Sequence, residues 1–310
     1  LVALSIGLVW AYIRNKITPM PLMIGLLVLS SFDLLALDQR YLSHENYIEA
    51  DELQQALVAT QADTQIQADP NKPFRVFDYS DEINGPWNSS RASYFHNAVS
   101  GYHPAKLALY QDLIERQLGN NNMNVFNMLN TKYFIGNNPA TQQPQAQINP
   151  DAFGPVWLVK QIHYVKTADD EMRALNTVNR DTAIVQEKFR NAIKLAPRFD
   201  SAATITVKDY LNDKITYDFN AASDQFAVFS EIYYPRGWRA FIDGKESEII
   251  KVNYALRGLA VPAGKHTIEF RFEPAAYKTG NTVMLICTII AFALLAAAIF
   301  FTVRKKQAKA

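Results

Sequence analysis

An acidic residue within an apolar segment is the first feature of the sequence that could handle charged groups. Asp33 interrupts the apolar run from Met20 to Leu37, and Arg40 follows it. A carboxylate inside a membrane span costs at least ~2.5 kcal/mol, and it tends to persist where it lines a cavity or meets a partner. Asp33 is therefore a candidate acidic residue, and Arg40 is a candidate contact for a phosphate group. Alternatively, Asp33 is solvated near the membrane boundary and Arg40 belongs to a polar collar at the surface.

Two basic side chains, His103 and Lys106, lie next to Pro104. We place this proline at the first position of an amphipathic helix that extends to Leu118, because proline suits that position. Backbone N–H groups and the helix dipole favour anions at such an N-terminus. His103 and Lys106 are therefore candidate contacts for the phosphate of a donor or for the substrate. The alternative is that His103 only caps the helix.

Four aromatic residues in the C-terminal half could stack on sugar rings, because their side chains combine an apolar ring face with a polar O–H or N–H group. They are Tyr233, Tyr234, Trp238 and Tyr254. We take Trp238 and Tyr254 as the candidates for sugar stacking. In a β-sandwich such residues are often part of the core, which is the alternative interpretation.

The composition excludes several classes of protein. The 310 residues carry 31 Lys and Arg against 30 Asp and Glu, a net charge of +1, so we expect no nucleic acid partner. The single cysteine, Cys287, can form no internal disulfide and cannot supply a zinc site by itself. We predict no metal site and no cofactor, with a divalent cation left as an open alternative. A glycine-rich phosphate loop and the HExxH and GxSxG motifs are absent.

Three apolar segments indicate a membrane protein. Val283 to Val303 contains no charge and is long enough to span the ~30 Å hydrocarbon core, and Met20 to Leu37 predicts a second span. Leu1 to Ile13 is equally apolar but shorter, so we interpret it as the cut end of a third span. The sequence therefore predicts a fragment of a longer polytopic membrane protein.

Basic residues predict the orientation of these spans, because Lys and Arg accumulate on the cytoplasmic side. They cluster after the first segment and after the last one, at Arg14, Lys16, Arg304, Lys305, Lys306 and Lys309. We therefore expect residues 38–282 to be extracytoplasmic and the C-terminus to be cytoplasmic.

The predicted fold class is membrane α-helices, two full spans plus one truncated, with a large extracytoplasmic α+β region that ends in a β-sandwich. The predicted domains are the truncated helix 1–13, the span 20–37, a mixed α/β region 38–150, a small α+β unit 151–200, a β-sandwich 201–275, the span 283–303 and a basic tail 304–310.

Local patterns predict the elements within the extracytoplasmic region. Helices are expected over Asn46–Thr60, before a polar stretch that ends at Asp69-Pro70, and over 104–118, 125–129 and 169–175. Strands are expected over 74–77, 132–135, 156–165, 182–185, 204–209, 214–219, 225–230, 239–242 and 266–272.

Turns and connections have signatures of their own. Asn137–Pro150 is rich in Asn, Gln and Pro and is predicted to be a flexible connection. Asp243-Gly244 suits a two-residue hairpin with positive φ, and Pro262–Lys265 suits a slightly longer hairpin. We expect the sandwich to contain seven to eight strands.

Three blocks of sequence resemble the C-terminal part of the bacterial YfhO family of multi-pass membrane proteins. The blocks are SGYHPAKLALYQDLIERQL, VFNMLNTKYFI and FSEIYYPRGWRAFIDGKESEIIKVNYALRGLAVPAGKHTIEFRFEP, followed by the terminal apolar segment. The resemblance covers nearly all of residues 20–305. It implies that the full-length protein is a GT-C-type glycosyltransferase with an extracytoplasmic active site and a polyprenyl-phosphate sugar as donor. Gram-positive relatives are associated with glycosylation of lipoteichoic acid.

The resemblance also implies what the chain lacks. GT-C enzymes carry their acidic catalytic residue in the first outer loop, which has no counterpart here, so no catalytic residue is carried over and the fragment alone is expected to be inactive. The expected partners are membrane lipid, a polyprenyl-phosphate sugar and a cell-envelope glycan acceptor. The alternative from another class is a membrane-anchored, non-catalytic module that binds envelope glycan or protein.

Overall fold

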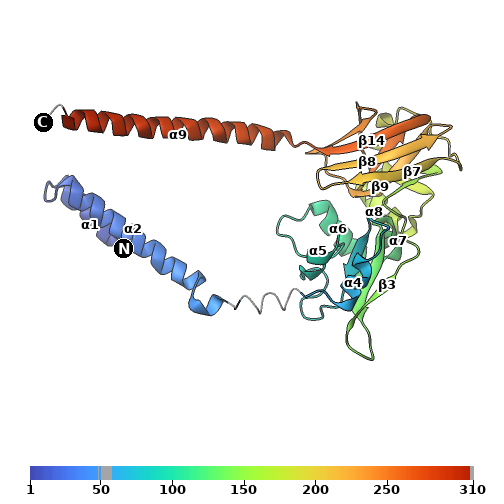
Figure 1. Cartoon of the computed structure of the whole chain (residues 1–310), viewed down its shortest axis with the longest axis horizontal. Helices are drawn as coiled ribbons and strands as arrows, with labels where there is room; N and C mark the ends of the chain where they lie inside the picture. Colours follow the sequence, from blue (N-terminus) through green and yellow to red (C-terminus); the bar gives the residue numbers. More distant parts are fainter. Residues whose placement is uncertain (48, 50–57, 308–310) are drawn as a thin grey trace. The chain divides into compact units, whose positions relative to one another are not determined.

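The computed structural model of the chain describes residues 1–47, 49 and 58–307. These residues fall into two compact units, Leu1–Ala59 and Thr60–Ala310. The two units are described separately below (Figure 1).

The first unit is a helical hairpin. Helix α1 covers Val2–Ile13 and helix α2 covers Pro19–Tyr41, followed by the 3₁₀ helix η1, His44–Asn46. The two helices pack closely because Gly25 has no side chain: a Cβ atom there would lie 2.7 Å from Leu8 Cδ1. Neither helix buries a residue within the chain, which is typical of helices that are covered by lipid or by other protein segments.

Among the described residues, two helices are long and apolar enough to cross a membrane. They are Pro19–Tyr41 and Ala275–Ala298, while Val2–Ile13 is apolar but shorter. The segment Ala275–Ala298 lies within helix α9, which covers Ala275–Gln307. All three predicted apolar segments are therefore helical, and two of them meet the criteria of length and composition for a membrane span.

The N-terminal part of the second unit departs from the predicted pattern. Residues 48 and 50–57 of the helix predicted over Asn46–Thr60 lie outside the described residues. The polar stretch that follows contains helix α4, Gln61–Gln67. This helix forms because Thr60 and Asp63 make a capping box, in which each side chain bonds the backbone N–H of the other.

A small sheet of three strands follows. Strand β1, Arg75–Asp78, runs parallel to β2, Thr131–Asn137, and β2 is antiparallel to β3, Pro144–Ile148. The prediction of a flexible connection over Asn137–Pro150 is therefore wrong. The side chains of β3 are mostly exposed, because β3 lies at the edge of the sheet. The polar composition of the segment therefore did not indicate a strand, which is recognised only from its backbone pairing.

Short helices cover this sheet and connect its strands. They are α5, Arg91–Phe95; α6, Ala108–Arg116; η2, Leu118–Asn120; and α7, Met123–Met128. Helix α6 begins later than predicted, at Ala108 rather than at Pro104.

A two-stranded parallel sheet comes next in the chain. Strands β5, Gln161–Val165, and β6, Thr182–Gln186, are connected by α8, Ala168–Ala174, and η3, Leu175–Thr177. The 3₁₀ helix η4, Glu187–Ala192, follows β6. The single strand predicted over Val156–Val165 is in fact two, because β4, Val156–Leu158, pairs with a different sheet.

Two larger sheets make up the rest of the second unit, with strand orders β11-β10-β14-β8-β7 and β12-β13-β9-β4. The strands not yet given are β7, Thr204–Tyr210; β8, Lys214–Ala221; β9, Gln225–Ile232; β10, Trp238–Ile242; β11, Lys245–Ser247; β12, Ile250–Val252; β13, Leu256–Val261; and β14, Gly264–Phe272. Tyr217, Phe229 and Phe270 come from both sheets and share one core, as expected for a β-sandwich.

Strand β9 explains how this sheet pair is attached to the rest of the unit. Ala227 and Phe229 point into the core between the two sheets, whereas Phe226 and Val228 point into a second core. This second core contains residues of α6, α7, α8 and β6. Alternation of side chains along a strand therefore makes β9 the common wall of two cores.

The turns at the ends of the strands were predicted with mixed success. Asp243 and Gly244 have φ values of 50° and 78° and close the β10–β11 hairpin, as predicted. Residues 262–265 do not form a hairpin, because β13 pairs with β9 while β14 pairs with β8 and β10. This connection crosses from one sheet to the other.

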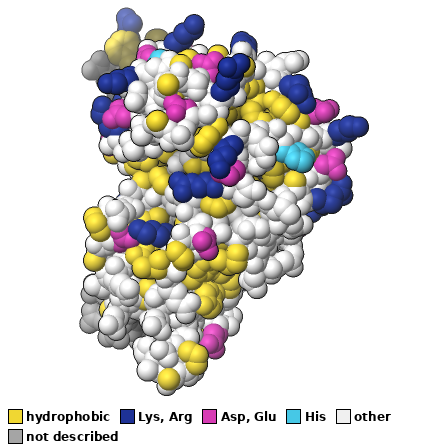
Figure 2. Space-filling view, turned by 90° about the vertical axis from the view of Figure 1, so that its right-hand side faces the viewer, with side chains coloured by type: hydrophobic (Ala, Val, Ile, Leu, Met, Phe, Trp, Pro, Cys, Tyr) yellow, Lys and Arg dark blue, Asp and Glu magenta, His cyan; other side chains and the backbone are white. Residues whose placement is uncertain are grey.

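The charge distribution on the visible face in Figure 2 is mixed. Lys and Arg side chains alternate with Asp and Glu side chains there, and no patch of a single sign stands out. This agrees with a net charge of +1.

Candidate functional site

A pocket lined by aromatic and acidic residues lies beside strands β10 and β11. Its volume is about 280 Å³, and its lining comes from the β9–β10 loop, strand β10 and the segment from β11 to β12. The lining residues are Tyr233, Tyr234, Pro235, Trp238, Arg239, Ala240, Glu246, Ser247, Glu248 and Ile249. We call it the aromatic pocket.

Four polar groups of the aromatic pocket have no protein partner. Within the described part of the chain, the hydroxyls of Tyr233 and Tyr234, the indole N–H of Trp238 and the carboxylate of Glu248 make no hydrogen bond or ion pair. Burial, followed by the nearby charge of Glu248, raises the pKa of Tyr233, so its hydroxyl keeps its proton at neutral pH. The pocket therefore offers three donors and one carboxylate to a ligand.

The other charged groups of the aromatic pocket compensate one another. Arg239 binds Glu246 with two bonds, Nε–Oε1 at 2.8 Å and Nη2–Oε2 at 2.5 Å, and it also contacts Glu273 at 3.1 Å. The hydrogen bond from Arg239 lowers the pKa of Glu246, so both groups stay charged. Glu248 is thus the uncompensated charge among the lining residues.

The ring of Trp238 is held in place by its neighbours. The guanidinium of Arg257 lies 4.2 Å from the ring centroid, and the ring of Phe272 lies 5.4 Å away. Arg257 is almost fully buried, and burial lowers its pKa to about 10, which leaves it charged at neutral pH. Gly237 allows Phe272 to approach, because a Cβ atom at Gly237 would lie 2.3 Å from the Phe272 ring.

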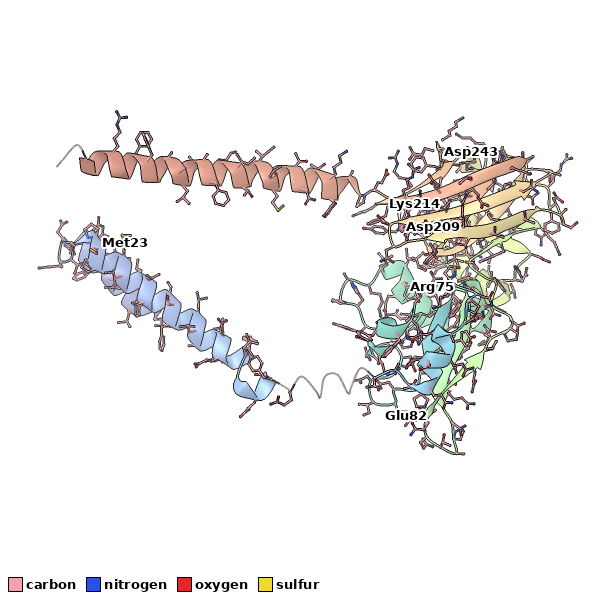
Figure 3. The ribbon with its side chains drawn as sticks, viewed as in Figure 1. Met23, Arg75, Glu82, Asp209, Lys214 and Asp243 are labelled. Atoms are coloured by element: carbon pink, nitrogen blue, oxygen red, sulfur yellow. The ribbon has the colours of Figure 1, made fainter. Side chains whose placement is uncertain are left out.

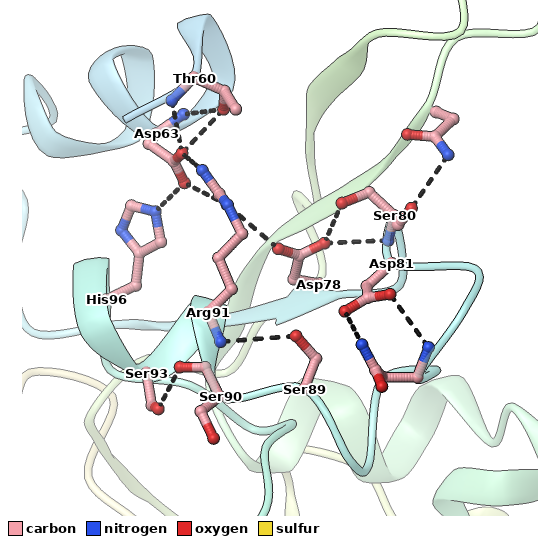
Figure 4. Close-up of polar contacts among 12 residues, drawn as sticks. Thr60, Asp63, Asp78, Ser80, Asp81, Ser89, Ser90, Arg91, Ser93 and His96 are labelled. Carbon is pink, nitrogen blue, oxygen red and sulfur yellow. Dashed lines mark hydrogen bonds and ion pairs between the residues drawn. The ribbon is translucent and has the colours of Figure 1, made fainter. Parts of the chain in front are cut away.

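A second polar cluster, centred on Asp63, ties helix α4 to helix α5 (Figure 4). The Asp63 side chain is fully buried and accepts hydrogen bonds from the Thr60 N–H at 2.7 Å and the Thr60 hydroxyl at 2.8 Å. It also pairs with the guanidinium of Arg91 and with Nε2 of His96, the latter at 2.9 Å. Arg91 lies 3.6 Å from Asp78 as well. The cluster thus joins α4, β1 and α5.

The ionisation of Asp63 follows from these contacts. Burial raises the pKa of this carboxyl, but the hydrogen bonds from His96, Arg91 and Thr60 outweigh burial and hold the pKa far below its usual range. The carboxylate can only accept, so Nε2 of His96 carries a hydrogen. Nδ1 of His96 has no partner among the described residues, and His96 lines a pocket of about 310 Å³ together with Lys72 and Ser93.

The predicted phosphate contacts His103 and Lys106 both precede the N-cap of helix α6. This N-cap is Leu107, with an extended backbone, so the predicted helix start at Pro104 is wrong, while a phosphate site at these two residues stays a prediction. The chain turns at Pro104 because Nδ1 of His103 accepts a 3.0 Å hydrogen bond from the N–H of Ala105. His103 is exposed and Lys106 is half-buried.

The remaining predicted residues lie in different places. Asp33 and Arg40 are exposed on α2, seven residues apart and therefore on the same side of the helix. They belong to the first unit, whereas His103 and Lys106 belong to the second, so convergence of these four residues on one site stays a prediction.

Tyr254 differs from Trp238 in its surroundings. Its side chain is buried, its hydroxyl donates to Asp112 Oδ2 at 2.5 Å and its N–H donates to the buried Glu171 at 2.8 Å. Lys251 lies over the ring at 4.5 Å. The tyrosine therefore connects α6 and α8 to the β12–β13 turn, and it does not line the aromatic pocket with Trp238.

Sequence reasoning missed Asp63, His96 and Glu248. The Thr60-x-x-Asp63 spacing is a capping-box signature that indicates the helix, although it does not identify the partners of the carboxylate. Nothing in the sequence distinguishes Glu248 from the paired Glu246. In the described part of the chain, no three His, Cys, Asp or Glu residues are grouped so that they could hold a metal ion.

Comparisons with known proteins place the aromatic pocket in a shared region. Residues 180–284, from just before β6 into α9, match the family described as bacterial membrane protein YfhO. An uncharacterized protein YfhO of Bacillus subtilis (strain 168) is 27% identical over 127 residues, which is 41% of this chain and 14% of that protein. No solved structure matches the chain. This match runs through strands β6 to β14 and into the apolar helix α9, so this part of the chain is similar to the YfhO family of bacterial membrane proteins.

Proposed function

We propose that the chain is the C-terminal part of an integral membrane glycosyltransferase. The full protein would use a polyprenyl-phosphate sugar as donor and would glycosylate a cell-envelope polymer or glycolipid on the outer face of the cytoplasmic membrane. The observation that carries the proposal is the family match over residues 180–284, which ends in the membrane-length helix α9. The chain aligns with only 14% of the length of its Bacillus relative, so the activity belongs to a longer protein.

The proposed reaction is a direct displacement at the anomeric carbon of the lipid-linked sugar. The acceptor hydroxyl attacks this carbon, its proton passes to a carboxylate, and the bond to the donor phosphate breaks. Cations stabilise the departing phosphate. On this chain, Arg40, His103 and Lys106 are the proposed phosphate contacts, and Asp33 is the proposed acidic residue.

The proposed topology places residues 38–282 outside the membrane and the C-terminus in the cytoplasm. The single cysteine makes this testable, because Cys287→Ser gives a background without cysteine. A cysteine at Ala140, in the exposed β2–β3 loop, should react with an impermeant maleimide in intact cells. A cysteine at Lys16, in the α1–α2 loop, should react only after the cells are permeabilised. The opposite pattern would refute the topology.

A non-catalytic module that binds envelope glycan is the second candidate. The observation that favours it is the aromatic pocket, whose four unpartnered polar groups suit binding but include no proton-transfer pair. In this case the chain would hold a glycan near the membrane while another protein performs the transfer.

Label transfer by the full-length protein tests the first proposal. The protein is purified in detergent and supplied with labelled polyprenyl-phosphate sugars and envelope acceptors, and the product is followed by mass spectrometry. We expect transfer, and we expect His103→Ala or Lys106→Ala to reduce it while Lys188→Ala, an exposed control, leaves it unchanged. Transfer unaffected by either variant would remove these residues from the site. No transfer with any donor would favour the glycan-binding module.

A further inference from the structure

We infer that the aromatic pocket beside β10 and β11 binds a single sugar ring that carries no negative charge. The role of this ring as part of the acceptor rests on the proposed function, whereas the binding itself does not. The inference is built on the unpartnered groups of Tyr233, Tyr234, Trp238 and Glu248, together with the charge and size of the pocket.

The first argument is the chemistry of the unpartnered groups. A sugar ring presents hydroxyls that both donate and accept, on a frame of C–H groups. The carboxylate of Glu248 can accept from hydroxyls, while the two tyrosine hydroxyls and the indole N–H of Trp238 can donate to them. The aromatic faces can pack against the C–H groups. Each kind of group that a sugar ring requires is present, and none of these four is satisfied by the described protein residues.

The second argument is rigidity. Trp238 is fixed between Arg257 and Phe272, and Phe272 also lies 6.4 Å from Tyr234. These contacts hold two of the lining rings in one arrangement before any ligand arrives. A site that is already ordered loses less conformational entropy on binding, which favours a real binding site over a surface depression.

The third argument is charge. Arg239 is neutralised by Glu246 and Glu273, so the lining residues carry the excess negative charge of Glu248. Arg236 belongs to the same loop but does not line the pocket. A phosphate or a uronate carboxylate placed here would meet Glu248 with no free cation in the lining, which is unfavourable. The pocket therefore selects neutral sugars or amino sugars against anionic ones.

The fourth argument is size and continuity. The volume of about 280 Å³ lies at the lower end of ligand pockets, ~300–1,000 Å³, which fits one ring rather than an oligosaccharide. A neighbouring pocket of about 540 Å³ shares Glu246, Ser247 and Glu248 with it and extends to His266. A longer glycan with one ring in the aromatic pocket could thus continue across β11.

Saturation-transfer NMR on the chain in a detergent without a sugar headgroup tests the inference. The probes are methyl β-D-glucoside, N-acetylglucosamine, glucosamine and glucose 6-phosphate. We expect transfer to at least one of the first three, and at least tenfold weaker binding of glucose 6-phosphate.

The variants are chosen to leave the fold intact. Glu248→Gln changes an exposed side chain without structural partners, and Tyr234→Phe removes only a hydroxyl. Because hydrogen bonds to charged groups are the stronger ones, we expect Glu248→Gln to weaken sugar binding about tenfold or more and Tyr234→Phe to weaken it less. The matched controls, Glu187→Gln and Tyr94→Phe, change exposed residues elsewhere and should leave binding unchanged.

The outcomes separate this inference from the proposed function. No signal from the three uncharged or amino sugars, equal binding of glucose 6-phosphate, or unchanged binding in Glu248→Gln would each overturn the inference. If binding is absent while the full protein still transfers label, the inference fails and the proposed function stands. If binding occurs but no donor supports transfer, the inference stands and the chain is a glycan-binding module.

Discussion

The buried carboxylate of Asp63 allows a quantitative test of how the second unit is held together. We predict that Asp63→Asn, which keeps the shape of the side chain and removes its charge, destabilises the chain strongly. The amide places an NH₂ group where the carboxylate now faces the donors Thr60, Arg91 and His96. The remaining amide oxygen cannot satisfy them all.

The magnitude follows from burial. Breaking a buried ion pair by removing one partner costs about 3–5 kcal/mol, and loss of a capping box costs ~1 kcal/mol. Arg91 is 23% exposed and keeps Asp78 at 3.6 Å, so we expect the lower end of the ion-pair cost, which with the capping box gives about 4 kcal/mol in total. For a folded unit of this size, ~1 kcal/mol shifts the Tm by about 2–4 °C, so the Tm should fall by roughly 8–16 °C.

Asp170 provides a matched control. Thr167 and Asp170 form the same capping box at α8, and Asp170 also pairs with an arginine, Arg173, but both side chains are exposed. Asp170→Asn should therefore cost only ~1 kcal/mol. Thermal unfolding in detergent, followed by near-UV circular dichroism, measures both variants. A Tm loss for Asp63→Asn no greater than that for Asp170→Asn would refute the reasoning from burial.

The pH dependence of the Asp63 effect has a defined sign. The pKa of Asp63 is lowered in the folded state, so its stabilisation is present above the unfolded pKa of about 3.9 and is lost as pH falls through the folded pKa. The part of the Tm difference between the wild type and Asp63→Asn that comes from ionisation of Asp63 itself should thus be lost only in strong acid.

Two further predictions concern the large sheets. Gly237→Ala should displace the Phe272 ring, which a Cβ atom would approach to 2.3 Å, and should therefore change the near-UV signal of Trp238 and lower the Tm; an unchanged spectrum would contradict the packing. The pair His266 Nδ1–Asp243 Oδ2, 2.6 Å apart at the turn labelled in Figure 3, raises the pKa of His266 and lowers that of Asp243. The histidine contribution is complete below its unfolded pKa of about 6.5 and is lost as pH rises through the folded pKa, whereas the aspartate contribution is present above its unfolded pKa of about 3.9. Asp243→Asn, which still tolerates positive φ, should lower the Tm more at about pH 5.5 than at pH 9, and equal losses at both pH values would refute this pairing.

Strands β7, β8, β9, β10 and β14 of the large sheets were predicted, and alternation of side chains is the signal where one face is buried, whereas the strands β11, β12 and β13 were not predicted. Along β14, Ile268 and Phe270 are buried while their neighbours are less so, and the sequence shows this period directly. Strand β3 escaped prediction because it is short, mostly exposed and lies in a segment rich in Asn, Gln and Pro, so that only its pairing with β2 identifies it as a strand. The break between β4 and β5 was missed because Lys160 and Gln161 interrupt the apolar run only briefly, and the pairing of β4 with β9 is what separates the two strands.

The sites depend more heavily on tertiary contacts than the strands do. Trp238 could be proposed from its residue type alone. Glu248 remains unpaired because Arg239 forms its ion pairs with Glu246 and Glu273 instead. The sequence does not specify these ion pairs. In the same way, Asp63 meets His96 across 33 positions of the chain. Local sequence patterns indicate helices and strands. Which charged side chain remains unpaired, however, is known only when the positions of all its possible ion-pair partners are known.

The link between the two halves of the second unit is itself a buried polar contact. Arg75 of β1, labelled in Figure 3, donates from Nη1 to the carbonyls of Leu129 at 2.8 Å and Ser230 at 2.7 Å, and its Nη2 lies 3.4 Å from Glu231. Ser230 and Glu231 directly precede the loop that lines the aromatic pocket. Because a buried guanidinium must keep its acceptors, the small sheet and the end of β9 hold each other in position. The position of the loop that carries Tyr234 and Trp238 therefore depends on a residue far away in the sequence, on a strand outside the two large sheets.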